Sequence, residues 1–329
     1  MIVRLLRAML VGQVLLGAGV AAWLVLAGTL PAWAAIAVGA LAPIAVHASV
    51  LTLDFALAWI GRGARPDGTA PCGLLTGLRA WSVAWAREVV DSVRTFSLAQ
   101  PLLGTRPLPA GPDTPARLPV VLVHGYFCNH ALWRPMARRL AARGHPVGAV
   151  DLEPVSASID DYAPRIAAAV DALRRRTGAT RVALVCHSMG GLAARAYLRA
   201  YGDEAVARVV TLGSPHRGTL HAAFGRGANV RQMRRDSAWL RDLAAGEPPE
   251  RCRRFTVMLS WQDNIVAPQC IQTLDGAQTV AFSGLGHVSL AYDRRVADAV
   301  LEALDTTPSA PDAGSAPSPV RGAAFVDAR

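Results

Sequence analysis

One serine, one aspartate and one histidine each follow a predicted strand, and together they are the residue types that nucleophilic catalysis needs. Ser188 follows one strand, Asp263 follows the strand predicted over residues 254–260, and His287 follows the strand predicted over 279–282. A serine hydroxyl needs a base to take its proton, and the base needs a partner that orients it. The sequence therefore predicts Ser188 as the nucleophile, His287 as the base and Asp263 as the residue that orients the base.

The surroundings of Ser188 are those of a nucleophile elbow. An apolar strand over residues 182–185 runs into a sharp turn with Ser188 at its apex, and a helical pattern over 192–200 follows. Such a strand–turn–helix exposes the serine oxygen above a sheet. The usual pattern is Gly-x-Ser-x-Gly, and here Cys186 occupies the first glycine position, so a small side chain is expected to suffice there.

Each of the three residues also has a simpler interpretation. A serine before glycines is often a turn or helix-cap residue; Asp263 also suits a turn, and His287 a helix cap. Three residue types at three matching strand ends, in the order Ser, Asp, His, favour the catalytic interpretation.

A tetrahedral intermediate formed at Ser188 needs hydrogen-bond donors for its oxyanion. The backbone N–H of Met189 is one candidate, because it directly follows the serine. The second candidate is the backbone N–H of Tyr126, in the loop after the strand at residues 119–124, or that of Phe127 if the loop is displaced by one residue.

Three further residues are predicted to contact substrate or shape its pocket: Phe127, His187 and His216. His187 is also expected to orient the elbow by packing and hydrogen bonding, as His124 is for its own loop. No pair of histidines or cysteines has metal-ligand spacing, so the sequence predicts neither a catalytic metal nor a cofactor.

Strands alternate with helices from residue 118 to residue 304, which predicts an α/β domain with a mostly parallel sheet of about six strands. The strands are expected over 119–124, 147–152, 181–186, 205–212, 254–260 and 279–282. Ligands of such sheets bind at the carboxyl ends of the strands, where all the candidate residues lie. Residues 215–253 form a long insertion that is predicted to be a lid or cap, or else an ordinary surface helix.

Residues 1–61 predict a transmembrane helical hairpin. Residues 8–30 and 32–53 are apolar, and Pro31 separates them; each stretch is long enough to cross a hydrocarbon core. The alternative is a cleaved signal over residues 1–34, against which the second apolar stretch argues. Arginines flank the hairpin at both ends and none lies between the spans, which predicts a multi-pass protein of the bacterial inner membrane with a cytoplasmic catalytic domain.

Residues 62–117 are predicted to contain an amphipathic helix over 74–99 and a proline-rich extended linker. The expected apolar stripe of this helix faces the membrane surface, the domain or the hairpin; it consists of Leu78, Trp81, Trp85, Val89 and Val93. Residues 305–329 are rich in proline, alanine and serine and are predicted to be disordered.

Composition bears on partners and compartment. All 34 basic residues are arginine and give a formal charge of +10; they are scattered without interleaved aromatics, so no nucleic-acid groove is predicted. The five cysteines are widely spaced, which suits a reducing compartment, although a Cys252–Cys270 bridge stays open.

Taken together, the motifs resemble the bacterial triacylglycerol lipase and esterase branch of the α/β-hydrolases over residues 118–304. They are Val-His-Gly-Tyr at 123–126, Cys-His-Ser-Met-Gly-Gly at 186–191, Thr-Leu-Gly-Ser-Pro-His-Arg-Gly-Thr at 211–219, Asp-Asn-Ile-Val-x-Pro at 263–268 and Gly-His-Val-Ser at 286–289. The resemblance implies Ser188, Asp263 and His287 as a triad, with the Tyr126 and Met189 N–H groups as the oxyanion hole.

The predicted function is a membrane-anchored serine carboxylic ester hydrolase that forms an acyl-enzyme on lipid or acyl esters. Its expected partners are that substrate and the bilayer, and no protein partner is implied. Two alternatives stay open: an acyltransferase with the same triad, and a catalytically silent scaffold tethered to the membrane.

Overall fold

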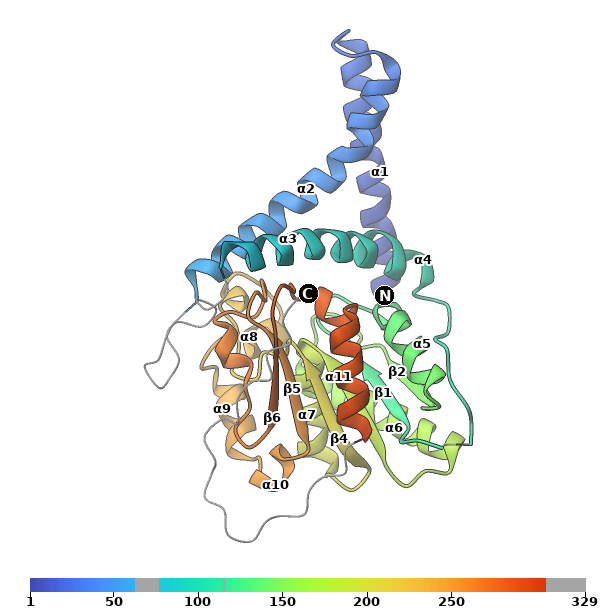
Figure 1. The fold of residues 1–329 in the computed structure, drawn as a ribbon, viewed down its shortest axis with the longest axis vertical. Helices are drawn as coiled ribbons and strands as arrows, with labels where there is room; N and C mark the ends of the chain where they lie inside the picture. Colours follow the sequence, from blue (N-terminus) through green and yellow to red (C-terminus); the bar gives the residue numbers. More distant parts are fainter. Residues whose placement is uncertain (63–76, 115, 306–329) are drawn as a thin grey trace.

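The computed structural model describes residues 1–62, 77–114 and 116–305. An α/β domain lies below a helical hairpin, and helix α3 (Leu78–Val93) crosses between them (Figure 1). The carboxyl ends of the strands face α3 and the hairpin, because loops that follow β2, β5 and β6 contact these helices.

Six parallel strands form the sheet, in the order β2-β1-β3-β4-β5-β6. The strands are β1 (Val120–Val123), β2 (Val147–Val150), β3 (Val182–His187), β4 (Val206–Leu212), β5 (Phe255–Ser260) and β6 (Gln278–Phe282). The predicted α/β fold and all six predicted strands are confirmed. Both faces of the sheet are buried, which is why these strands appear as continuous apolar runs in the sequence.

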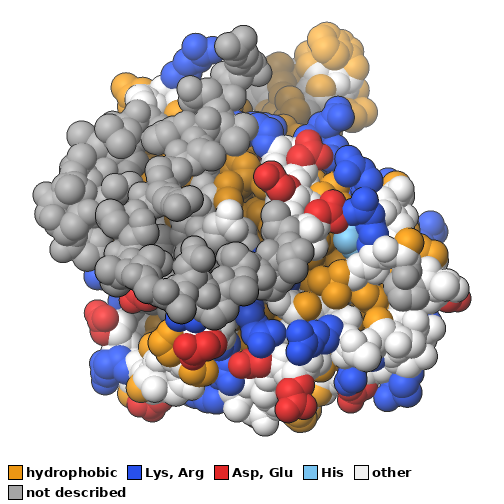
Figure 2. All heavy atoms as spheres, turned by 60° about the horizontal axis from the view of Figure 1, so that its bottom comes forward, with side chains coloured by type: hydrophobic (Ala, Val, Ile, Leu, Met, Phe, Trp, Pro, Cys, Tyr) orange, Lys and Arg blue, Asp and Glu red, His pale blue; other side chains and the backbone are white. Residues whose placement is uncertain are grey.

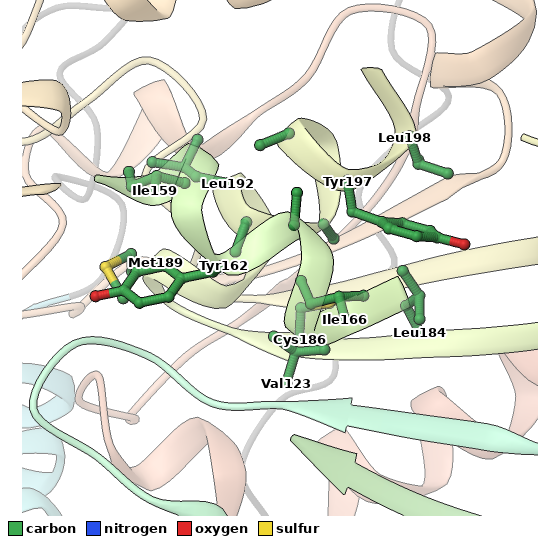
Figure 3. Close-up of a cluster of buried hydrophobic side chains, with 14 of the residues drawn as sticks. Val123, Ile159, Tyr162, Ile166, Leu184, Cys186, Met189, Leu192, Tyr197 and Leu198 are labelled. Carbon is green, nitrogen blue, oxygen red and sulfur yellow. The ribbon is translucent and has the colours of Figure 1, made fainter. Parts of the chain in front are cut away.

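Helices cover the two faces of the sheet. Helices α6 (Ala163–Thr177) and α7 (Met189–Tyr201) pack on one face, where Cys186 lies among Val123 and Leu184 (Figure 3). Helices α5 (Arg134–Ala142) and α11 (Arg294–Asp305) pack on the other face. On the side of the domain turned away from the hairpin, arginines are interspersed with acidic residues (Figure 2).

The hairpin consists of α1 (Ile2–Leu26) and α2 (Ala32–Ile60), both long and apolar enough to cross a membrane. The two helices pack closely at Gly17 and Gly39, where an added Cβ on either residue would overlap the other's carbonyl oxygen. Towards the domain they diverge (Figure 1). The hairpin therefore rests on the domain at two separate places.

Helix α3 continues through the π-helical stretch η1 (Arg94–Ala99) into α4 (Gln100–Leu103). The prediction of a helix is confirmed, but its end at residue 99 is wrong by one turn; its predicted start falls outside the described residues. The predicted apolar stripe does not coincide with the face that packs inwards, since Trp81 is buried but Leu78 is 74% and Trp85 37% exposed. The buried face instead combines polar and apolar side chains, namely Trp81, Ala84, Glu88, Ser92, Thr95 and Gln100.

The segment after α4, which belongs to the predicted proline-rich extended linker, packs on the domain. The N–H of Val147 in β2 donates to the carbonyl of Ala110 at 2.7 Å, and Gly111 lies against the backbone of His145. The tail predicted to be disordered lies outside the described residues from 306 onwards.

The cysteines differ from the expectation. Cys252 is a free, buried thiol, whereas Cys270 is disulfide-bonded, so the Cys252–Cys270 bridge is absent. Disulfides persist in oxidising compartments, and Cys270 therefore argues against the reducing compartment that the cysteine spacing suggested.

The insertion at 215–253 folds into four short helical segments. They are η4 (Leu220–Ala223), α8 (Ala228–Gln232), α9 (Ala238–Ala245) and α10 (Pro249–Cys252). Arg195 of α7 forms a buried ion pair with Glu247, with Nε to Oε1 at 2.8 Å. This pair fixes the end of the insertion to the domain.

Candidate active site

Ser188 occupies a strained turn between β3 and α7. Its φ is 55° and its ψ is −128°, a conformation that non-glycine residues rarely adopt. Its backbone N–H donates to the carbonyl of Leu212 at 2.9 Å, and Met189 begins the helix directly. The turn thus has the strand–turn–helix shape that the sequence predicted.

Glycines allow the segments around this turn to approach one another. A Cβ on Gly190 would lie 2.7 Å from the carbonyl oxygen of His124, and one on Gly125 would lie 2.7 Å from the Cβ of Ser188. Cys186, by contrast, faces the core beneath α7, and burial raises the pKa of its thiol. Its small side chain is packed there and does not approach the site.

His287 and Asp263 form a buried hydrogen-bonded pair. The Nδ1 of His287 lies 2.9 Å from Oδ2 and 3.1 Å from Oδ1 of Asp263. The Oδ1 atom also accepts from the N–H groups of Ile265 and Val266, at 2.9 and 2.8 Å. A carboxylate with these donors needs the proton of His287 on Nδ1, which leaves Nε2 as the acceptor.

Two carboxylates control the charge of His287. Burial lowers the pKa of His287, but the charge and hydrogen bond of Asp263 and the charge of Glu88 outweigh it, so the pKa is raised above its usual value. The imidazolium form that a base passes through is therefore stabilised at this position.

His187 connects the serine turn with the base. Its Nε2 lies 3.0 Å from the carbonyl oxygen of His287, and the two rings are 4.7 Å apart. Burial, together with the charge of His287, lowers the pKa of His187 to about 3, so its ring is neutral and donates from Nε2. Because His187 directly precedes Ser188, these contacts link the backbone of the serine turn to the loop of the base.

No hydrogen bond joins Ser188 Oγ and His287 within residues 1–62, 77–114 and 116–305. Catalytic hydrogen bonds are often long in ligand-free enzymes and shorten when substrate binds.

The loop proposed for the oxyanion lies beside Ser188. His124 donates from Nδ1 to the carbonyl of Gly125 at 2.9 Å, and its Nε2 accepts from Leu152 N–H at 3.0 Å. Tyr126 is partly exposed, and Phe127 has a positive φ of 58°. Met189 is the first residue of α7, where backbone N–H groups have no partner within the helix.

His216 packs against the sheet and α7. Its Nε2 is 3.0 Å from the hydroxyl of Thr211, its carbonyl accepts from Arg195, and its ring meets Phe255 edge-on at 6.2 Å. These contacts do not bring its side chain to Ser188.

The insertion at 215–253 reaches the site through α8. Asn229 donates to the carbonyl of Val155 at 2.6 Å, and its amide also lies 3.6 Å from Met189 Sδ and 3.4 Å from the hydroxyl of Tyr162. The segment thus covers the residue that follows the serine.

Two residues that contact the His287 loop were not predicted. Asn264 accepts from His287 N–H at 3.0 Å, and the fully buried Glu88 of α3 accepts from Val288 N–H at 2.8 Å. The spacing of Trp81, Ala84 and Glu88 on one helix face was a signal, but a glutamate on such a face is normally assigned to solvent.

The chain was compared with protein families and with known proteins. The model of the alpha/beta hydrolase fold matches residues 119–287. A triacylglycerol lipase of Burkholderia plantarii is 35% identical over 158 residues, which are 44% of this chain and 42% of that protein. One of Pseudarthrobacter phenanthrenivorans is 37% identical over 119 residues, 33% of this chain and 36% of that protein. The matches thus span about two fifths of these relatives.

Solved structures agree in fold. The mature Bacillus licheniformis lipase BlEst2 has a TM-score of 0.51 at 19% identity, and the match covers 60% of this chain and 95% of that one. Aspergillus fumigatus lipase B has a TM-score of 0.51 at 17% identity, with 58% and 53% covered. At these identities the likeness concerns the fold alone.

Proposed function

We propose, from the fact that this chain belongs to the α/β-hydrolase fold family, that it is a serine-dependent lipase or carboxylesterase held at a membrane. The observation that carries the proposal is the buried His287–Asp263 pair, at 2.9 Å, beside the strained turn of Ser188. The triacylglycerol lipases among its relatives support an acyl ester as the substrate class.

In the proposed mechanism Ser188 Oγ attacks the ester carbonyl carbon while His287 Nε2 takes the hydroxyl proton. Asp263 stabilises the imidazolium through Nδ1. The N–H groups of Met189 and of Tyr126 stabilise the oxyanion of the tetrahedral intermediate. When the C–O bond to the alcohol breaks, His287 gives its proton to the leaving alcohol, and an acyl-Ser188 enzyme remains.

Hydrolysis of the acyl-enzyme repeats these roles with water. His287 takes a proton from water, whose oxygen attacks the acyl carbonyl carbon, and then returns a proton to Ser188 Oγ as the carboxylic acid leaves. Phe127 is proposed to contact the acyl group, since its loop lies beside Gly125 and Ser188. The contacts of His187 and His216 support orienting and structural roles for these two residues.

A lipid substrate is proposed because of where the site lies. The carboxyl edge of the sheet faces the hairpin (Figure 1), and both hairpin helices are largely unburied and apolar. A hairpin inserted in the inner membrane would hold this edge close to the bilayer surface, where acyl esters of lipids are concentrated.

Two observations bear on which side of the membrane the domain occupies. The arginines that flank the hairpin favour the cytoplasm, and the disulfide at Cys270 favours an oxidising compartment. Alkaline phosphatase or a fluorescent protein fused after Asp305 distinguishes them, because the phosphatase matures only outside the cytoplasm. Phosphatase activity with no fluorescence would contradict the cytoplasmic location.

The activity is tested with full-length protein purified in detergent. We expect Ser188→Ala to reduce turnover of a p-nitrophenyl acyl ester by at least about 1000-fold, whereas Ser283→Ala, in the loop after β6, should keep it. A profile of a bacterial lipid extract before and after incubation then identifies the substrate. Wild-type turnover by the Ser188→Ala variant would contradict the proposal.

A further inference from the structure

Glu88 of helix α3 is fully buried against the loop that follows His287. One carboxylate oxygen accepts from the N–H of Val288 at 2.8 Å, and the other accepts from the N–H and the hydroxyl of Ser289, at 2.9 and 2.8 Å. All three donors belong to the two residues directly after His287. This carboxylate therefore fixes the backbone that carries the proposed base.

The same continuous helix also contacts the loop proposed for the oxyanion. Gln100, at the start of α4, is fully buried, and its Oε1 accepts from the N–H of Asn129 at 2.6 Å. The side chain of Asn129 donates back to the carbonyl of Gln100 at 3.2 Å. Asn129 lies two residues after Phe127, at the end of the loop that begins at Gly125.

We infer that the helix of residues 78–103 is a working part of the active site, in which Glu88 positions the His287 loop and Gln100 positions the oxyanion loop. The inference rests on the proposed function, since it assigns positioning roles for that reaction. Neither residue touches the reacting atoms. The helix lies outside residues 119–287, where the family model matches, so this chain obtains part of its active-site support from its membrane-side region.

Burial alone does not explain a glutamate at this position. Removing a carboxylate from water is costly unless charge and hydrogen bonds compensate, and an apolar side chain would fill the same space at a lower cost. Three donors compensate here, and all three come from the His287 loop. The position is therefore better explained by what Glu88 does to that loop than by the stability of the helix contact.

Gly286 allows the His287 loop to contact Glu88 of α3 directly, because it has no side chain. A Cβ on Gly286 would overlap the carboxylate and the Cβ of Glu88, so the loop and the helix touch without an intervening side chain. An alanine at position 286 would push the carboxylate out of place without removing its charge.

Glu88 is also one of the charges that act on the base. The titratable groups facing His287 are Asp263 from the β5 loop, Glu88 from α3, His187 from β3 and His221 from the insertion. Burial raises the pKa of Glu88 to about 7, so near and above neutral pH its charge favours the protonated form of His287.

The first experiment compares Glu88→Gln with Arg87→Ala in full-length protein. Arg87 is the neighbouring residue, and its ion pair with Asp293, at 2.7 Å, also joins the helix to the domain. We expect Glu88→Gln to lower kcat at least tenfold with KM nearly unchanged, and to move the acid limb of the kcat/KM profile to lower pH. Arg87→Ala should keep kcat and the acid limb within about twofold and 0.2 pH units of wild type.

A second variant, at Gln100, tests the contact with the oxyanion loop separately from the contact with the His287 loop. Gln100→Met keeps the length of the side chain but removes the acceptor for Asn129 N–H. It should lower kcat by about tenfold and leave the acid limb in place, because no charge near His287 changes. A fall in kcat with an unmoved acid limb in Glu88→Gln would overturn the electrostatic part of the inference.

A double-mutant cycle tests the contact itself and does not depend on the amide variant. Gly286→Ala alone should lower kcat, and Glu88→Gly alone should lower it as well. In the double variant the added Cβ occupies the space that the whole Glu88 side chain, its Cβ included, has left, so its kcat should be no lower than that of Glu88→Gly alone. If the double variant lowers kcat by the product of the two single effects, and its circular dichroism spectrum is that of wild type, the inference is overturned.

Failure of this inference differs from failure of the proposed function. If wild type and Ser188→Ala have the same turnover, the function is wrong. If Ser188→Ala is inactive while Glu88→Gln has wild-type kcat and pH profile, the function stands and the positioning role of the helix is wrong.

Discussion

The sheet domain and helix α3 bury different mixtures of side chains. In the domain, Val123, Leu184 and Leu192 lie in the core, and charged residues lie on the surface (Figures 2 and 3). In α3, Glu88 and Ser92 face the domain, while Val90 is 65% exposed. Apolar burial organises the domain, whereas the inner face of α3 combines an apolar contact at Trp81 with the hydrogen bonds that Glu88 makes to the site. An exposed apolar side next to an apolar helical hairpin is what an interfacial helix presents to lipid.

The largest effect is expected in the domain, at Asp263. Asp263→Asn keeps the shape of the side chain but presents an amide to His287 Nδ1, which favours the wrong tautomer. We expect kcat to fall by about 10⁴-fold, measured with a p-nitrophenyl acyl ester. A loss below about tenfold would mean that Asp263 does not orient the base.

The next effect is on the free energy of unfolding, and it tests the apolar burial in the domain. Leu184 of β3 is fully buried between α6 and α7. Leu184→Ala removes packed apolar volume, and we expect a loss of about 2–5 kcal/mol in the free energy of unfolding. Urea denaturation in detergent, followed by tryptophan fluorescence, measures it. An unchanged midpoint would contradict a core organised by apolar burial.

Glu88 should make the free energy of unfolding depend on pH, which the burial of Leu184 does not. Its pKa is about 7 in the folded protein, against an ordinary value of 4.5, so the folded state holds the proton more tightly than the unfolded state. The stability associated with this group is therefore present below pH 4.5 and lost as the pH rises to about 7, a loss of about 3 kcal/mol above neutrality.

Urea midpoints at pH 5 and pH 8 check this prediction for wild type and Glu88→Gln. The difference between the two pH slopes then reports Glu88 together with its effect on His287, because the remaining groups titrate equally in both proteins. Wild type should lose more stability than the variant on going to pH 8. Parallel slopes would show that Glu88 titrates as an exposed glutamate does.

The smallest effect is expected on the outer side of α3. Val90→Ser replaces an exposed apolar side chain, and in detergent we expect a change within about 0.5 kcal/mol in the free energy of unfolding. In vesicles the same variant should reduce protection of α3 from hydrogen exchange. A loss of more than about 1 kcal/mol in detergent would mean that Val90 packs against the protein.

The sequence predicts the sheet domain well because both faces of its parallel sheet are covered. Each strand is then an apolar run, and the loops after such strands hold Ser188, Asp263 and His287. The same reasoning does not identify the inner face of α3, because its apolar stripe leaves open whether that stripe faces the domain, the hairpin or the membrane surface. Glu88 is buried because donors 200 and 201 residues further along the chain come to it, and no local pattern reports such partners.

The packing of residues 104–114 on the domain could not be predicted for a related reason. Prolines indicate an extended chain, but whether that chain is free or packed depends on the surface beside it. Here the carbonyl of Ala110 meets the N–H of Val147, a pairing with the edge strand that composition does not indicate.

The role of Ser188 as a nucleophile activated by His287 is tested most directly by labelling with a fluorophosphonate. Full-length protein in detergent is incubated with the probe at pH 8, digested and analysed by mass spectrometry. We expect a single labelled serine, Ser188, with labelling lost in Ser188→Ala and slowed in both Asp263→Asn and Glu88→Gln. An unlabelled Ser188 in folded wild-type protein, or equal labelling of another serine, would contradict this role.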